Sequence, residues 1–204
     1  ESISKVISIL NSNRNDNLLI VVSALSGITN HLQECLSLKG KSTDNVLNII
    51  EERHLEVINN LSDLDGQSSL KSFLKENLNQ LEDILDAIST IDEVTKKTVS
   101  KVLTLGELLS SKIIYEILIQ RGFDIKYVDS KDLIFTKEVN SNEILDRDKT
   151  SINIKNNLDL SKSKMIIAPG FICSDESGEI SNLGRGGSDF TAAIYAKYCN
   201  AKSL

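Results

Sequence analysis

The chain has 204 residues, of which 40% are hydrophobic and 25% are charged, and its formal net charge is −6. This composition is ordinary for a globular chain, and the length suits one domain or one large piece of a longer protein. The negative charge argues against a protein that follows nucleic-acid phosphates, and no apolar run approaches the roughly 18 residues of a membrane helix. Three widely spaced cysteines, none in CxxC spacing, and the lack of a signal-peptide pattern indicate reduced thiols in the cytoplasm and no cysteine metal site.

The N-terminal part of the chain predicts a helix, a strand and a second helix. Apolar residues spaced from Ile3 to Leu10 indicate a short amphipathic helix, which the Asn-rich stretch 11–17 ends. The continuous apolar run 18–22 predicts a strand buried on both faces, as in a parallel sheet. A loop of small residues and a helix over about 28–37 follow, which together make half of a βαβ unit.

The middle of the chain is predicted to be helical. Two apolar stripes, over 47–61 and 70–88, indicate an antiparallel helix pair with its turn at Asp65-Gly66. The segment 90–93 has the pattern of a capping box, and Thr95 is another candidate cap. A third helix is predicted over about 96–120, with Gly122 as its C-terminal stop.

Strands and helices alternate again in the C-terminal part. The predicted elements are strands over 123–128 and 165–168, helices near 152–160 and over 188–198, and a hairpin turn over 174–181. This alternation indicates an α/β fold with a mostly parallel sheet. Because ligands of such sheets bind at the carboxyl ends of strands, the loops 23–29 and 170–189 are expected to meet at one site.

The run 183–189, Leu-Gly-Arg-Gly-Gly-Ser-Asp, is the most informative segment of the chain. Its glycines let backbone approach a ligand closely, and Arg185 offers a planar fork that suits a carboxylate or phosphate. Ser188 and Asp189 fall at a predicted helix N-terminus, where free N–H groups favour anions. The run matches neither the Walker A nor the dinucleotide fingerprint. We predict a loop that holds an anionic small molecule; the alternative is a tight turn with a surface arginine.

Two further segments carry polar groups in unusual places. The loop 23–30 puts hydroxyl groups between a strand and a helix, either to bind ligand oxygens or because Ser26 or Thr29 caps the helix. Glu107 lies among apolar residues beside Gly106, and a glycine inside a helix costs about 1 kcal/mol relative to alanine. Close approach of another group explains that glycine. Glu107 is then either the partner of an ammonium group or a solvated helix glutamate.

Taken together, these segments resemble those of aspartokinases. The segment 21–30 resembles the first substrate loop of that family, and 105–110 resembles its Gly-Glu segment. Pro169-Gly170-Phe171-Ile172 followed by 183–193 is similar to its most specific signature. The segments occur in the family's order and span essentially the whole chain. The helical middle also resembles forms that are fused to homoserine dehydrogenase.

The resemblance implies the amino acid kinase (carbamate kinase-like) fold, a three-layer α/β/α sandwich around a mainly parallel sheet. It implies transfer of the γ-phosphoryl group of ATP, bound with Mg²⁺, to the β-carboxylate of L-aspartate. The product, 4-phospho-L-aspartate, leads to lysine, threonine and methionine. The full-length enzyme is expected to be a cytoplasmic homo-oligomer with no nucleic-acid or membrane partner.

The resemblance also implies roles for individual residues. Arg185 would clamp a substrate carboxylate, Glu107 would receive the α-ammonium group, and Asp189 would organise the loops and the catalytic lysine. The remaining substrate contacts would come from the hydroxyl groups of Ser23, Thr29 and Ser188, the ring of Phe171, and the backbone of Gly186 and Gly187.

Two departures from the family pattern limit the expectation. The family begins with a KFGG-type segment whose lysine stabilises the transferring phosphoryl group, and this chain starts just after that point. The family's nucleotide-binding half, with its TDVDG-like segment, would lie beyond Leu204. We therefore expect residues 1–204 to be a partial, aspartate-binding domain that is inactive alone. Two alternatives stay open: a kinase of glutamate, acetylglutamate or a nucleotide, and a non-catalytic amino-acid sensor.

Overall fold

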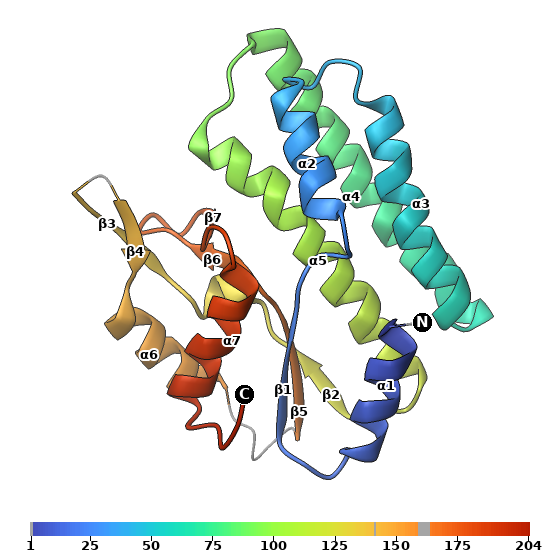
Figure 1. The fold of residues 1–204 in the computed structure, drawn as a ribbon, viewed down its shortest axis with the longest axis vertical. Helices are drawn as coiled ribbons and strands as arrows, with labels where there is room; N and C mark the ends of the chain where they lie inside the picture. The colour runs from blue at the N-terminus through green and yellow to red at the C-terminus, as the bar shows by residue number, and fades with distance from the viewer. Residues whose placement is uncertain (1, 141, 159–163) are drawn as a thin grey trace.

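A three-stranded parallel sheet lies at the centre of the computed structural model, which describes residues 2–140, 142–158 and 164–204 (Figure 1). Its order is β1 (Leu18–Val22), β5 (Met165–Pro169) and β2 (Ile125–Tyr127). Every residue of β5 is buried, because β5 has a hydrogen-bonded neighbour on each side. The predicted strand over 18–22 is confirmed. Its first four residues are only partly buried, because β1 lies at an edge of the described sheet.

Helices cover both faces of the sheet. Side chains of β1 alternate between two apolar clusters: Leu18 and Ile20 join one cluster, and Leu19 and Val21 join the other. The first cluster includes α1 (Ser2–Ser12) and α5 (Lys96–Gln120), and the second includes α6 (Arg147–Asn157) and α7 (Gly187–Tyr198). The predicted three-layer α/β/α architecture is therefore confirmed (Figure 1).

A group of helices extends the first layer beyond the sheet (Figure 1). It consists of α2 (Ile28–Ser37), α3 (Asp44–Leu61), α4 (Leu64–Ile91) and α5. Each helix packs against the next one in the sequence, and α5 also packs against α2. The predicted antiparallel pair is α3 and α4. None of the helices in the described ranges has the length and apolarity that a membrane crossing requires.

The predicted turn at Asp65-Gly66 is wrong, because both residues lie in the first turn of α4. Asp63 is the residue that begins this helix: its Oδ1 accepts a hydrogen bond from the Gly66 amide at 2.7 Å. The cap thus occurs three residues before the glycine. A carboxylate that satisfies a free amide at the helix start makes the Asp-Gly pair compatible with helix.

The capping box predicted at 90–93 is also wrong, since α4 continues to Ile91 and Asp92 ends it in the left-handed conformation. Lys39 and Lys41 pair with the Asp92 carboxylate at 3.1 and 3.2 Å. The second candidate cap, Thr95, is confirmed as the cap of α5, because its Oγ1 accepts a hydrogen bond from the Thr98 amide at 3.1 Å. Gly122 follows α5 with φ of 72° and acts as the predicted stop.

Two antiparallel hairpins flank the second layer. The hairpin of β6 (Ile172–Ser174) and β7 (Ile180–Asn182) agrees with the turn predicted over 174–181. The hairpin of β3 (Thr136–Val139) and β4 (Asn142–Leu145) was not predicted, because both strands are short, charged and largely exposed. Helix α6 begins at Arg147, earlier than predicted, because the Asp146 carboxylate caps it; its predicted end near 160 lies outside the described residues.

A buried histidine lies inside the helical group. His54 on α3 is fully buried, and its Nδ1 lies 2.7 Å from the Ile50 carbonyl oxygen. A carbonyl only accepts hydrogen bonds, so Nδ1 carries the proton and Nε2 is an acceptor. Nε2 is buried without a partner among the described residues. Burial lowers the pKa of His54 below its ordinary value of 6.5, and the bond to Ile50 partly opposes this shift.

We predict that His54 makes the fold sensitive to acid. The unfolded chain binds the proton more readily than the folded one, so the contribution of neutral His54 is fully present above about pH 6.5 and decreases as the pH falls below it. The loss is at most about 1.4 kcal/mol per pH unit. The free energy of unfolding is measured with urea at pH 7.5 and 5.5 for wild type and His54→Leu, and wild type should lose more stability between the two pH values. Equal pH dependence in the two proteins would contradict the prediction.

Candidate functional site

Two loops that lead from strands into helices meet at a cavity of ≈440 Å³. One loop joins β1 to α2, the other precedes α7, and α5 contributes Glu107 between them. The cavity wall contains all nine residues with predicted roles, although those roles stay predictions: Ser23, Thr29, Glu107, Phe171, Arg185, Gly186, Gly187, Ser188 and Asp189. The other described lining residues come from the same two loops and were not assigned substrate contacts, although Ser26 was named as a possible cap or ligand-binding hydroxyl: Ala24, Leu25, Ser26, Gly27, Asn30 and Gly184.

Two helix N-termini lie at this cavity. Gly27 precedes α2 with φ of 87°, and Gly186 precedes α7 with φ of 74°, and no side chain caps either helix. The alternative in which Ser26 or Thr29 caps the helix is therefore wrong. Uncapped helix starts leave amide groups free, and the helix dipoles add positive potential there. The two helix starts are therefore suited to anionic groups.

The opposite charge comes from Glu107. Glu107 is only 4% exposed, and its Oε2 has no hydrogen-bond partner among the described residues. Burial raises the pKa of Glu107 to about 7, and hydrogen bonds from backbone amides, that of Ala24 first, partly oppose this. The alternative of a solvated helix glutamate is wrong. A buried carboxylate without a counter-charge is costly, so a ligand that supplies an ammonium group would relieve it.

Gly106 allows α5 to approach the other wall closely, as predicted. A Cβ atom at this position would lie 2.8 Å from the Cβ of Ala24 and 3.4 Å from Cγ2 of Ile28. The approach is fixed by Ser110 on α5, whose Oγ donates a hydrogen bond to the Ser23 carbonyl oxygen at 2.7 Å. The absence of a side chain at Gly106 thus lets Glu107 reach the cavity.

The glycine loop is attached to α5 through a residue that sequence reasoning missed. Oδ1 of Asn182 on β7 accepts a hydrogen bond from the Gly184 amide at 3.0 Å. Nδ2 of Asn182 donates to Oγ of Ser100 on α5 at 2.9 Å. Ser100 lies two helical turns before Glu107. A single amide therefore connects the loop that carries Arg185 with the helix that carries Glu107.

Phe171 is held in a conformation that is uncommon for a bulky residue. Its φ is 64°, its amide donates to Thr191 Oγ1 at 3.0 Å, and its carbonyl accepts from the Leu183 amide at 2.9 Å. Its ring lies against the glycine loop, since a Cβ at Gly187 would be 2.6 Å from Cδ2 of Phe171. Backbone strain of this kind persists only where the surroundings hold it, and it gathers at functional sites.

Arg185 is exposed and forms no hydrogen bond or ion pair with any other residue that the structure describes. Its guanidinium group is therefore available to a ligand. Asp189 is also exposed on the cavity wall. The described residues contain no group of three or more His, Cys, Asp or Glu side chains placed to hold a metal ion. The site offers a cationic fork, two helix starts and one buried carboxylate, which together suit a small zwitterion.

All 204 residues match the model of the amino acid kinase family. The chain belongs to this family. The Chlamydia pneumoniae aspartokinase is 31% identical over 187 residues, which are 91% of this chain and 39% of that protein. The chloroplastic bifunctional aspartokinase/homoserine dehydrogenase 2 of Arabidopsis thaliana is 27% identical over 208 residues, which are 100% of this chain and 23% of that protein.

Solved structures show the same fold. Escherichia coli aspartokinase III, in complex with lysine and aspartate, superposes with a TM-score of 0.84 at 24% identity. The match covers 98% of this chain and 44% of that one. This member of the amino acid kinase family thus spans less than half the length of the aspartokinases that it resembles.

We predict that Gly106→Ala lowers the free energy of unfolding. The added methyl group overpacks the contact with Ala24, at a cost of about 1–3 kcal/mol, and the better helix propensity of alanine returns only about 1 kcal/mol. Ser68→Ala, at an exposed position of α4, is the matched control and should change stability little. Urea denaturation measures both variants. A Gly106→Ala protein at least as stable as wild type would show that the approach of α5 is not tight.

Proposed function

We propose that these residues form the L-aspartate side of an aspartate kinase, which transfers the γ-phosphoryl group of ATP to the β-carboxylate of L-aspartate. The observation that carries the proposal is the buried Glu107 carboxylate, whose Oε2 has no hydrogen-bond partner among the described residues, in one cavity with the unpaired guanidinium group of Arg185. Aspartate has one ammonium and two carboxylate groups, so it carries a partner for each of these two side chains.

In the proposed complex the α-ammonium group pairs with Glu107, and Arg185 binds a carboxylate with two parallel hydrogen bonds. The hydroxyl groups of Ser23, Thr29 and Ser188 stand beside the starts of α2 and α7 and would donate to carboxylate oxygens. Gly186 and Gly187 would approach the ligand by backbone, and Phe171 would close the pocket.

The reaction needs positioning and charge neutralisation more than proton transfer. A β-carboxylate oxygen attacks the γ-phosphorus atom, the bond between that phosphorus and the bridging oxygen breaks, and ADP leaves. The attacking carboxylate is already ionised at neutral pH, so no general base is required, and no histidine lines the cavity. We assign Asp189 to the organisation of the loops around the reacting groups.

ATP is the proposed phosphoryl donor, and Mg²⁺ would reach the site with it and neutralise phosphate charge. One Escherichia coli aspartokinase III structure holds aspartate together with ADP, which supports this choice. The described residues that line the cavity include no lysine. The family resemblance assigns the lysine that would stabilise the transferring phosphoryl group to a KFGG-type segment.

An acceptor panel tests the function. The whole protein is supplied with Mg·ATP and, in turn, L-aspartate, L-glutamate, N-acetyl-L-glutamate and a nucleoside monophosphate, and ADP release is measured. We expect release with L-aspartate only. Release with another acceptor supports a different amino acid kinase, whereas aspartate binding without release supports an amino-acid sensor. Either result would overturn the proposal.

We predict that aspartate binding weakens in acid because protons compete for Glu107. The pKa of this carboxyl group is about 7 in the empty cavity, and only the ionised form pairs with ammonium. About one tenth of the groups are ionised one pH unit below the pKa, so the affinity should fall about tenfold between pH 8 and pH 6. Calorimetry with L-aspartate at both pH values measures the change.

Two variants separate this effect from others. Glu107→Gln should lose the pH dependence and bind aspartate at least about tenfold more weakly, because a charge-assisted contact of about 1.5–3 kcal/mol is lost. Glu116→Gln, at an exposed position of the same helix, should behave as wild type. An unchanged pH profile in Glu107→Gln would refute the assignment of this residue.

A further inference from the structure

A second cavity lies behind the glycine loop, between α6, α7 and the β3–β4 hairpin. Its volume is ≈1010 Å³, against ≈440 Å³ for the candidate substrate site. Gly184 lines both cavities, so the loop that carries Arg185 separates them. This volume is at the upper end of the range for pockets that take small organic ligands, about 300–1,000 Å³.

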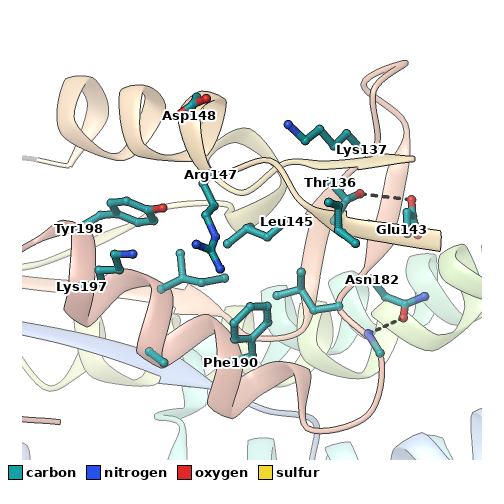
Figure 2. Close-up of a pocket in the computed structure, with 15 residues that line it drawn as sticks. Thr136, Lys137, Glu143, Leu145, Arg147, Asp148, Asn182, Phe190, Lys197 and Tyr198 are labelled. Atoms are coloured by element: carbon teal, nitrogen blue, oxygen red, sulfur yellow. Dashed lines mark hydrogen bonds between the residues drawn. The ribbon is translucent and has the colours of Figure 1, made fainter. Parts of the chain in front are cut away.

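The walls of this cavity are mainly apolar, and two of the lining side chains are aromatic. Phe190 and Tyr198 come from α7, and Leu145 faces them from the end of β4 (Figure 2). Phe190 is 45% exposed, and Ile144 is 44% exposed. Because leaving such side chains in water is unfavourable, a ligand with an apolar body would gain free energy by covering them.

One cation extends among these apolar side chains. Arg147, the first residue of α6, reaches across the cavity toward α7 (Figure 2), and it forms no hydrogen bond or ion pair within the described ranges. Lys197 adds a second positive charge from α7.

The acidic side chains that line the cavity do not pair with the Arg147 guanidinium group. The Glu143 carboxylate accepts hydrogen bonds from Thr136 at 3.2 Å and Ser181 at 3.0 Å, and Asp148 lies at the outer side of α6 (Figure 2). An unpaired guanidinium group beside apolar walls selects a ligand that is both apolar and anionic.

We propose that this cavity is a second ligand site, which binds an organic anion with an aromatic body and one carboxylate or sulfonate group paired with Arg147. The aromatic body would lie between the β3–β4 hairpin and α7, against Phe190 and Leu145. The site stands apart from the proposed kinase function, since none of Arg147, Phe190 or Leu145 lines the substrate cavity.

Occupation of this site would restrain the glycine loop. Asn182, Leu183 and Gly184 form one wall of the cavity, and Asn182 is the residue that holds the Gly184 amide. A ligand packed against this wall would stabilise the bond between Asn182 and the Gly184 amide from the side opposite the substrate cavity. Hydrogen exchange of the segment 180–187 should therefore slow when the site is filled.

The test uses 8-anilinonaphthalene-1-sulfonate, a fluorescent aromatic anion, on the whole protein. We expect one saturable site with at least about tenfold weaker binding in Arg147→Ala, which loses a charge-assisted contact of about 1.5–3 kcal/mol. Ala193→Trp, which fills the cavity from the exposed side of α7, should abolish binding independently. Arg53→Ala on α3 is the control for general charge effects and should bind as wild type.

Competition checks the chemistry of the ligand. 3-Phenylpropanoate should displace the probe from wild type at least about tenfold better than 3-phenylpropanol, which has the same ring without the charge. Slower exchange over 180–187 should appear with the probe in wild type but not in Arg147→Ala. Equal probe binding in wild type, Arg147→Ala and Ala193→Trp, absence of a saturable site, equal displacement by acid and alcohol, or unchanged exchange over 180–187 would each overturn the proposal.

Discussion

Burial of the Glu107 carboxylate without a cationic partner is the constraint on which the candidate site depends. Such a group is stable only if the rest of the fold holds it in place, and here α5 does so through the bare backbone of Gly106 and the bond from Ser110 to the first loop. The unmet charge then defines what can enter: a neutral molecule leaves the cost in place, whereas a cationic group removes it. The same carboxylate therefore lowers the stability of the empty protein and selects a ligand with a cationic group.

The α/β architecture brings the complementary charge to the same place. The first loop follows β1 of the parallel sheet, and the glycine loop follows the β6–β7 hairpin that comes directly after β5 of the same sheet. The two loops therefore meet at one edge of the sheet although more than 140 positions separate them in the sequence. Both loops end in a left-handed glycine that begins a helix, which presents amide groups without a side-chain cap. The cavity therefore combines free helix-start amides, which favour anionic groups, with a buried carboxylate, which favours a cationic group, and a molecule that carries both charges suits it.

Patterns with a local cause were predictable from the sequence. The bounds of α2, α5 and β1 agree with those predicted from local sequence patterns. The nine site residues were named from the resemblance to aspartokinases; they line one cavity, and their roles remain predictions. Features with a distant cause were not. The β3–β4 hairpin is held by hydrogen bonds that the hydroxyl groups of Thr136 and Ser181 donate to the Glu143 carboxylate. The start of α4 depends on Asp63 rather than on the Asp-Gly pair. Asn182 gave no signal, because its importance arises from Ser100, 82 positions away.

Helix α5 is a single rod of 25 residues, about 37 Å long at 1.5 Å per residue, and its start lies against β7 of the β6–β7 hairpin. Glu107 lies near its middle, and Ser100, which is bonded to the Asn182 side chain, lies near its start. A tilt of about 3° around the midpoint would shift the ends of a rod of this length by about 1 Å. Glu107 lies close to the pivot of such a tilt and would move little, whereas Ser100, and through it Asn182 and the glycine loop, would move with the start of the helix. A change of packing among α2, α3 and α4 that tilted α5 would therefore shift the loop that carries Arg185 relative to Glu107.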